Sequence, residues 1–303
     1  MPRFDQDDAV LLAATEVLPG EWRDLSDLLL RPGAPKEGLR SYLQRRSTSG
    51  DELRVFLAEN LDPSRVAFWE NRLAALAEQR PGVRMVAVTD HRYPSNLLSV
   101  YDRPPFLFME GVIEDRDERA IAIVGSRSAS REALAAAAAL AQAAVKAEIT
   151  VVSGLARGVD AAAHRAALDA GGRTIAVLGT GIDRVYPAEH ASLAAEIATH
   201  GAVVSQFRPG SPPAKSTFPM RNAVVSGLSL VSVLVEATER SGTRSEADHA
   251  VRQGRPALLW EPILGVEVWA QRFVTTPCVG WINSAEDIGA VVDSRVGPPS
   301  RTG

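Results

Sequence analysis

The chain has 303 residues, with 33 lysines and arginines against 37 aspartates and glutamates, a formal net charge of −4. Hydrophobic residues make up 46% of it, the composition of a globular protein with a sizeable core and room for two domains. The charge argues against a protein that coats DNA through bulk positive charge, although it allows a local basic groove. The single cysteine, Cys278, excludes an internal disulfide, and we expect it to be a small buried hydrophobe.

The amino-terminal residues, MPRFDQDDAV, lack the basic-then-apolar order of a signal peptide. No apolar run approaches the roughly 18 residues of a membrane span. We therefore expect a cytoplasmic protein with no membrane partner.

Residues 1–80 have the spacing of short amphipathic helices. DDAVLLAATEVL, DELRVFLAENL and DPSRVAFWENRLAALAEQR each place apolar residues at helical intervals. We predict a small helical module for residues 1–80, of the SAM or helix-hairpin-helix kind. Residues 81–118 hold two short strand patterns and several prolines, and we predict a connector packed on the next domain.

From residue 119 to residue 294 short apolar strands alternate with helical stretches. The strand candidates are AIAIV (120–124), ITVV (149–152), TIAVL (174–178), AVVS (202–205), LVSVLV (230–235) and PALLW (256–260). Continuously apolar strands separated by helices indicate a parallel sheet that is buried on both faces. The sequence therefore predicts an α/β fold, a doubly wound, mostly parallel Rossmann-like sheet preceded by a helical domain. We expect the tail, 295–303, to be disordered.

Five loops that follow these strands are rich in glycine, serine and threonine. They read GSRSAS (125–130), SGLARGVD (153–160), GTGIDRVYP (179–187), QFRPGSPPAKSTFPMRN (206–222) and EATERSGTRSE (236–246). Backbone N–H groups at helix starts attract anions, and arginine matches the geometry of phosphate. Between Glu196 and Glu236 there is no acid, but this interval contains Arg208, Lys215 and Arg221. The pattern predicts an anion-binding edge of the sheet with a local field for a polyanion.

Other sites have weaker support. GTGIDRV lacks the third glycine of a dinucleotide fingerprint, and no P-loop sequence occurs. Asp160 and His164 stand one helical turn apart with no nucleophile elbow, so we expect Asp160 to cap that helix and His164 to pack beneath it. The five histidines lack metal-ligand spacing. We expect no metal and no cofactor.

The loops resemble the DNA-processing protein family DprA, also called Smf. The matching text is AIAIVGSRSAS, SGLARGVDAAAHRAALDAGGRTIAVLGTGIDRVYPAEH, FPMRN followed by SGLS, and VEATERSG. The resemblance implies a Rossmann-like, non-enzymatic protein that binds single-stranded DNA, forms a homodimer and helps to load the RecA recombinase. The DNA- and phosphate-binding residues that it implies are Gly125, Ser126, Arg127, Ser153, Gly154, Arg157, Lys215, Arg221, Asn222, Ser241, Gly242 and Thr243. Phe207 and Phe218 are candidates for stacking on bases.

The last loop departs from that family, which has a hydroxyl-rich segment where this chain reads SGTRSEAD. Gly242 to Glu246 also resembles the G-T-x-x-E segment of nucleoside-monophosphate phosphoribohydrolases. That alternative implies a nucleotide-cleaving enzyme or a nucleotide sensor, with Arg221 on the phosphate and Glu246 at the ribose. A third possibility is an interaction module that has lost its ligand and acts through its amino-terminal helices.

Overall fold

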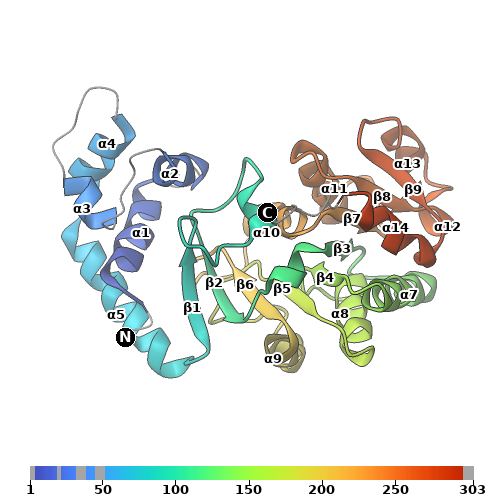
Figure 1. Cartoon of the computed structure of the whole chain (residues 1–303), viewed down its shortest axis with the longest axis horizontal. Coiled ribbons are helices and arrows are strands. Elements are labelled where there is room, and N and C mark those ends of the chain that lie inside the picture. The colour runs from blue at the N-terminus through green and yellow to red at the C-terminus, as the bar shows by residue number, and fades with distance from the viewer. Residues whose placement is uncertain (1–3, 19–21, 32–38, 45–51, 296–303) are drawn as a thin grey trace, which may run out of the picture.

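A nine-stranded sheet forms the centre of the computed structural model, which describes residues 4–18, 22–31, 39–44 and 52–295 (Figure 1). Its strands are β1 (Val83–Ala87), β2 (Phe106–Gly111), β3 (Ala120–Val124), β4 (Thr150–Ser153), β5 (Thr174–Val177), β6 (Ala202–Ser205), β7 (Val231–Leu234), β8 (Ala257–Trp260) and β9 (Val279–Ile282).

The strand order is β1-β2-β6-β5-β4-β3-β7-β8-β9. Strands β3 to β9 pair in parallel, while β2 is antiparallel to both of its neighbours. From β3 the chain runs outward through β4, β5 and β6, then returns to place β7 on the other side of β3. The strand order therefore reverses between β3 and β7, and open α/β sheets bind their ligands at such a point.

Helices cover both faces of the sheet, as side-chain alternation along β3 requires. Ile121 and Ile123 pack in a cluster with α7 (Arg131–Lys146), α8 (Val159–Asp169) and α14 (Ile288–Asp293). Ala120 and Ala122 belong to a second cluster, which includes residues of α10 (Thr217–Leu228) and α11 (Gly242–Arg252). The remaining helices of this part are α6 (Ser95–Leu98), α9 (Ala191–His200), α12 (Glu261–Leu264) and α13 (Val268–Phe273), with 3-10 turns η1 (Asp115–Glu118), η2 (Ala188–His190) and η3 (Ala285–Asp287).

The amino-terminal helices lie beside β1, at the left of Figure 1. They are α1 (Gln6–Val17), α2 (Trp22–Leu29), α3 (Leu39–Gln44), α4 (Glu52–Asn60) and α5 (Pro63–Gln79). Trp22 contacts Phe106 of β2 and Phe207 of the loop after β6, with ring centroids 6.2 and 6.1 Å apart. These helices therefore share one hydrophobic cluster with the sheet. Among the helices of the described residues, none is both long and apolar enough to cross a bilayer.

The predicted fold class is confirmed, and all six predicted strands occur within one residue of their expected ends. β1 and β2, predicted as part of a connector, pair as strands of the same sheet, and β9 was not predicted. The expectation that Cys278 is buried is wrong: it is exposed, in a turn with φ of 64° just before β9. The division into domains stays a prediction, and the tail beyond residue 295 lies outside the described residues.

A buried ion pair fastens the amino-terminal ends of the central strands. Arg173, before β5, donates from Nε and Nη2 to the two carboxylate oxygens of Asp117 at 2.8 and 2.7 Å. Thr150 of β4 donates to the same carboxylate at 2.6 Å. Burial alone would raise the pKa of Asp117, but the bonds from Arg173, Thr150 and the Glu114 N–H together lower it below its ordinary value.

We expect Asp117→Ala to lower the free energy of unfolding by about 3 kcal/mol, the low end for a broken buried pair, because Arg173 loses both bonds to Asp117 but keeps those to Glu114 and the Val112 carbonyl. Asp115→Ala, in the same turn but exposed, is the matched control and should change it by less than about 0.5 kcal/mol. Urea denaturation at neutral pH measures both. The difference should shrink below pH 3.8, because the unfolded chain then binds a proton that the folded chain excludes. Equal losses in the two variants would contradict this role.

Candidate nucleic-acid interface

A cavity of about 630 Å³ opens where the strand order reverses. Its walls come from the loops after β3, β4 and β7 and from the first turns of α10 and α11. It brings together nine of the twelve predicted binding residues: Gly125, Ser126, Arg127, Gly154, Arg221, Asn222, Ser241, Gly242 and Thr243. Four of the five predicted loops therefore meet at one edge, as parallel strands require.

The start of α11 directs backbone donors into this cavity. The Ser241 hydroxyl caps the helix by accepting from the Arg244 N–H at 3.2 Å. The N–H groups of Gly242 and Thr243 make no hydrogen bond to any described residue. Asn222 donates from Nδ2 to the Gly242 carbonyl at 3.0 Å and so fixes the helix start against α10. Two free N–H groups at the positive end of a helix are suited to an anion.

Arg221 lies beneath the cavity and not on its open surface, with only 6% of the residue exposed. Its Nη1 donates to the carbonyls of Gly154, after β4, and Val177, at the end of β5. Its Nε donates to Asn222 Oδ1 at 3.1 Å. Nη2 makes no hydrogen bond to a described residue. Arg221 thus chiefly has a structural role, because it holds the ends of β4 and β5 together. Its Nη2 keeps its hydrogen-bonding capacity.

Asp160 and Glu246 flank Arg221, and each is almost completely buried. Burial raises the pKa of both carboxyl groups, and the positive charge of Arg221 opposes this effect. Asp160 Oδ2 accepts from the N–H groups of Gly154 and Ala156 at 3.2 and 3.3 Å. The prediction that Asp160 caps its helix is therefore corrected: α8 begins after Gly158, and Asp160 instead fixes the preceding loop.

His164 lies on the buried face of α8, between the helix and the sheet, as predicted. Its Nδ1 lies 2.6 Å from Thr174 Oγ1, and the residue is fully buried. Burial lowers the pKa of His164 to about 3, with smaller contributions from His190 and Arg221. A neutral, enclosed imidazole of this kind is a core residue.

The mouth of the cavity combines an arginine with aromatic rings. The guanidinium of Arg127, an exposed residue, lies 4.7 Å from the ring centroid of Phe218. Phe218 in turn packs against Tyr186, with centroids 6.0 Å apart, and Tyr186 is 44% exposed. Tyr186 was not predicted as a site residue, although its loop was. The other stacking candidate, Phe207, is buried against Trp22.

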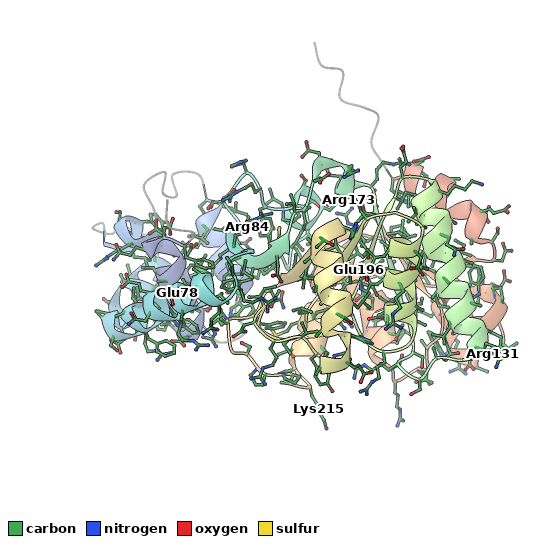
Figure 2. All side chains as sticks on the ribbon, turned by 90° about the horizontal axis from the view of Figure 1, so that it is seen from below. Glu78, Arg84, Arg131, Arg173, Glu196 and Lys215 are labelled. Carbon is green, nitrogen blue, oxygen red and sulfur yellow. The ribbon has the colours of Figure 1, made fainter. Side chains whose placement is uncertain are left out.

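Three predicted binding residues lie outside the cavity. Ser153 is fully buried, and its hydroxyl donates to the Ile123 carbonyl at 2.6 Å, tying β4 to β3. Arg157 points to the surface and forms a two-bonded ion pair with Glu189, 2.7 Å in each bond. Figure 2 shows Lys215 projecting outward on the same side as Arg131, at the start of α7, and opposite to Arg173. Lys215 is exposed and does not line the cavity.

The predicted basic stretch is not a continuous positive surface. Arg208 pairs with Glu16 of α1 at 3.4 Å, and its guanidinium lies 5.9 Å from the Trp69 ring centroid. Two of the three cations in this stretch are therefore not available on the surface of the cavity: Arg208 pairs with the helical module, and Arg221 is buried. The cavity wall also carries Glu236 and Glu267, which were not predicted. Glu236 accepts from the Ser130 N–H at 3.2 Å.

Gly154 leaves room for the Arg221 guanidinium, because a Cβ at this position would overlap its terminal nitrogens. We expect Gly154→Ala to displace Arg221 and to lower the free energy of unfolding by about 1–3 kcal/mol. Gly242→Ala is the control, since a Cβ there meets nothing within 4 Å, and it should leave stability nearly unchanged. Thermal and urea unfolding test both variants. If Gly154→Ala is as stable as the native chain, the structural role of Arg221 is wrong.

Comparison with known proteins matches the part of the chain that forms the sheet and the cavity. A family model described as DNA recombination-mediator protein A matches residues 84–273. DNA processing protein DprA of Streptococcus pneumoniae is 38% identical over 169 residues, 56% of this chain and 60% of that protein. Protein Smf of Escherichia coli is 39% identical over 178 residues, 58% of this chain and 48% of that protein. The matched part thus spans about half to three-fifths of these relatives.

Solved structures agree with the architecture. The X-ray structure of DNA processing protein A from Streptococcus pneumoniae superposes with a TM-score of 0.73 at 26% identity, covering 95% of this chain and 98% of that one. DNA processing protein A from Helicobacter pylori superposes with a TM-score of 0.61 at 23% identity, covering 71% of this chain and 97% of that one. The fold, the cavity at the strand reversal and the matched family model lead to one conclusion: the chain belongs to the DNA recombination-mediator protein A family.

Proposed function

We propose that this protein binds single-stranded DNA across the cavity mouth and acts in DNA processing during uptake and recombination. The observation that carries the proposal is the convergence of free N–H groups, Arg127 and the Tyr186–Phe218 pair at one edge of the sheet. Membership of a recombination-mediator family supports it. So does the Helicobacter pylori protein, whose structure was described for its single-stranded DNA binding mode.

The arrangement suits a strand whose bases are unpaired. The N–H groups of Gly242 and Thr243 and the guanidinium of Arg127 would hold phosphates, while the Tyr186 and Phe218 rings offer faces for bases. Such contacts do not distinguish one base from another, so binding would be tolerant of sequence and sensitive to salt.

We expect Arg127→Ala to weaken the binding of labelled oligothymidylate and oligoadenylate to a similar extent. If Arg127 neutralises one phosphate, the slope of log affinity against log salt should fall by about 0.7. Fluorescence anisotropy over a salt series measures both quantities.

Arg116→Ala is the matched control, because Arg116 is an exposed arginine at the opposite end of β3. It should leave both the affinity and the slope unchanged. An Arg127 variant that binds like the native chain, or an equal loss in both variants, would remove Arg127 from the interface.

We propose binding in preference to the alternative activity, cleavage of a base from ribose phosphate. That reaction needs a negatively charged carboxylate beside the sugar cation that develops. Burial raises the pKa of Glu246 well above its ordinary value, which favours the neutral acid. Incubation with nucleoside monophosphates and chromatography for free base tests this choice, and base release that Glu246→Gln abolishes would reverse it.

The finer parts of the function remain proposals from the family resemblance. They are contact with the RecA recombinase, formation of a homodimer and a cytoplasmic location.

A further inference from the structure

One face of α5, in the helical module, presents an aromatic ring between two arginines. Arg65, Phe68 and Arg72, here called the α5 face, stand three and four positions apart, the spacing that places residues on one side of an α-helix. The Arg65 guanidinium lies 4.3 Å from the centroid of the Phe68 ring. Phe68 is 41% exposed, and the side chains of Arg65 and Arg72 are 42% and 46% exposed. All three side chains are therefore accessible to a partner.

Contacts of Arg72 join the α5 face to the loops at the cavity mouth. Arg72 Nη2 lies 3.8 Å from Asp183 Oδ2, in the loop after β5. A Cβ at Gly210, in the loop after β6, would lie 3.3 Å from the same nitrogen. The Gly210 N–H donates to Asp183 Oδ1 at 2.8 Å, so both loops meet α5 at this point. Tyr186 follows Asp183 by three residues, a span of about 11 Å at most, and the α5 face is therefore adjacent to the mouth.

Positive charge exceeds negative charge around the α5 face. Glu16 accepts two hydrogen bonds from Arg65, at 2.8 and 2.7 Å, and also lies 3.4 Å from Arg208, so one acid serves two arginines. Arg72 makes no hydrogen bond to a described residue, although it lies near one acid. Arg184, exposed on the loop after β5, forms no ion pair with any residue that the structure describes. This local excess of guanidinium groups suits a polyanion.

The α5 face and the cavity mouth present the same pair of groups. At the mouth the Arg127 guanidinium lies 4.7 Å from the Phe218 ring centroid, and on α5 Arg65 lies at a similar distance from Phe68. An arginine on an aromatic ring suits a nucleotide, because a base stacks on the ring or the guanidinium while the charge attracts phosphate. A single strand repeats bases and phosphates along its length, so one strand can engage both pairs.

We infer that the α5 face is a second contact surface for single-stranded DNA, onto which a strand continues after it leaves the cavity mouth past Tyr186. This inference rests on the proposed function and extends its binding surface from the sheet to the helical module. A strand that is long enough to cover both surfaces gains contacts with Phe68 and Arg72. A strand that fills the mouth alone gains nothing from them, so the contribution of α5 depends on strand length.

Fluorescence anisotropy with oligothymidylates of about 4 and about 16 nucleotides tests this dependence on length in the full chain. For the longer strand, Phe68→Ala should weaken binding at least about fivefold, because it removes a ring on which a base stacks. Arg72→Ala should lower the slope of log affinity against log salt by about 0.7, because it removes one phosphate contact. The shorter strand, measured by competition with the labelled longer one, should bind both variants as it binds the native chain.

Phe56→Ala and Arg23→Ala are the matched controls. Phe56, on α4, is 44% exposed, and the Arg23 side chain, on α2, is 58% exposed and faces Tyr101. Both controls should bind either strand like the native chain. No loss for the longer strand in the α5-face variants, an equal loss for both strand lengths, or an equal loss in the controls would overturn the inference and leave the proposed function standing. If the native chain binds neither strand, the proposed function is wrong, and the inference falls with it.

Discussion

The reversal of strand order between β3 and β7 is the constraint on which the site depends. After β3 the chain turns toward β4 on one side, and after β7 it turns toward β8 on the other. The two connections diverge and leave a space that no crossover helix fills. Arg221 lies beneath that space and fastens α10 to the ends of β4 and β5. The strand order creates the cavity, and the buried guanidinium of Arg221 lies at the bottom of it.

The electrostatics of the cavity depend more on backbone groups than on net charge. The chain as a whole is acidic, two of the three cations in its acid-free stretch are engaged or buried, and three glutamates line the wall. The features that suit an anion are the start of α11 and Arg127 at the mouth.

The sequence predicted the fold well because the signals were local. Apolar runs such as AIAIV and AVVS are buried on both faces of a parallel sheet, and glycine-rich turns follow them. Four of the five predicted loops also met at one edge, which parallel strands impose. The roles of individual side chains were harder to predict, because they depend on contacts between distant segments. Arg221 and Ser153 look alike as loop residues, yet one supports the cavity floor and the other ties β4 to β3.

Other misses have the same origin. Arg157 and Arg208 are paired with Glu189 and Glu16, which lie 32 and 192 positions away in the chain. Nothing in the sequence was a reason to select Tyr186, because its place near the cavity depends on its contact with Phe218. β9 was missed because its residues, VGWI, are only partly buried and include a glycine, which weakens the strand pattern.

The shared hydrophobic cluster makes the amino-terminal helices part of the body of the protein. Trp22 covers Phe106 of β2, and Phe4 packs against Phe108, with ring centroids 6.2 Å apart in each pair. A fragment that began at β1 would expose these rings on the face of β2, an apolar patch prone to self-association. Because the helical module and the sheet share this hydrophobic cluster, removing the module would expose apolar surface of the sheet to water.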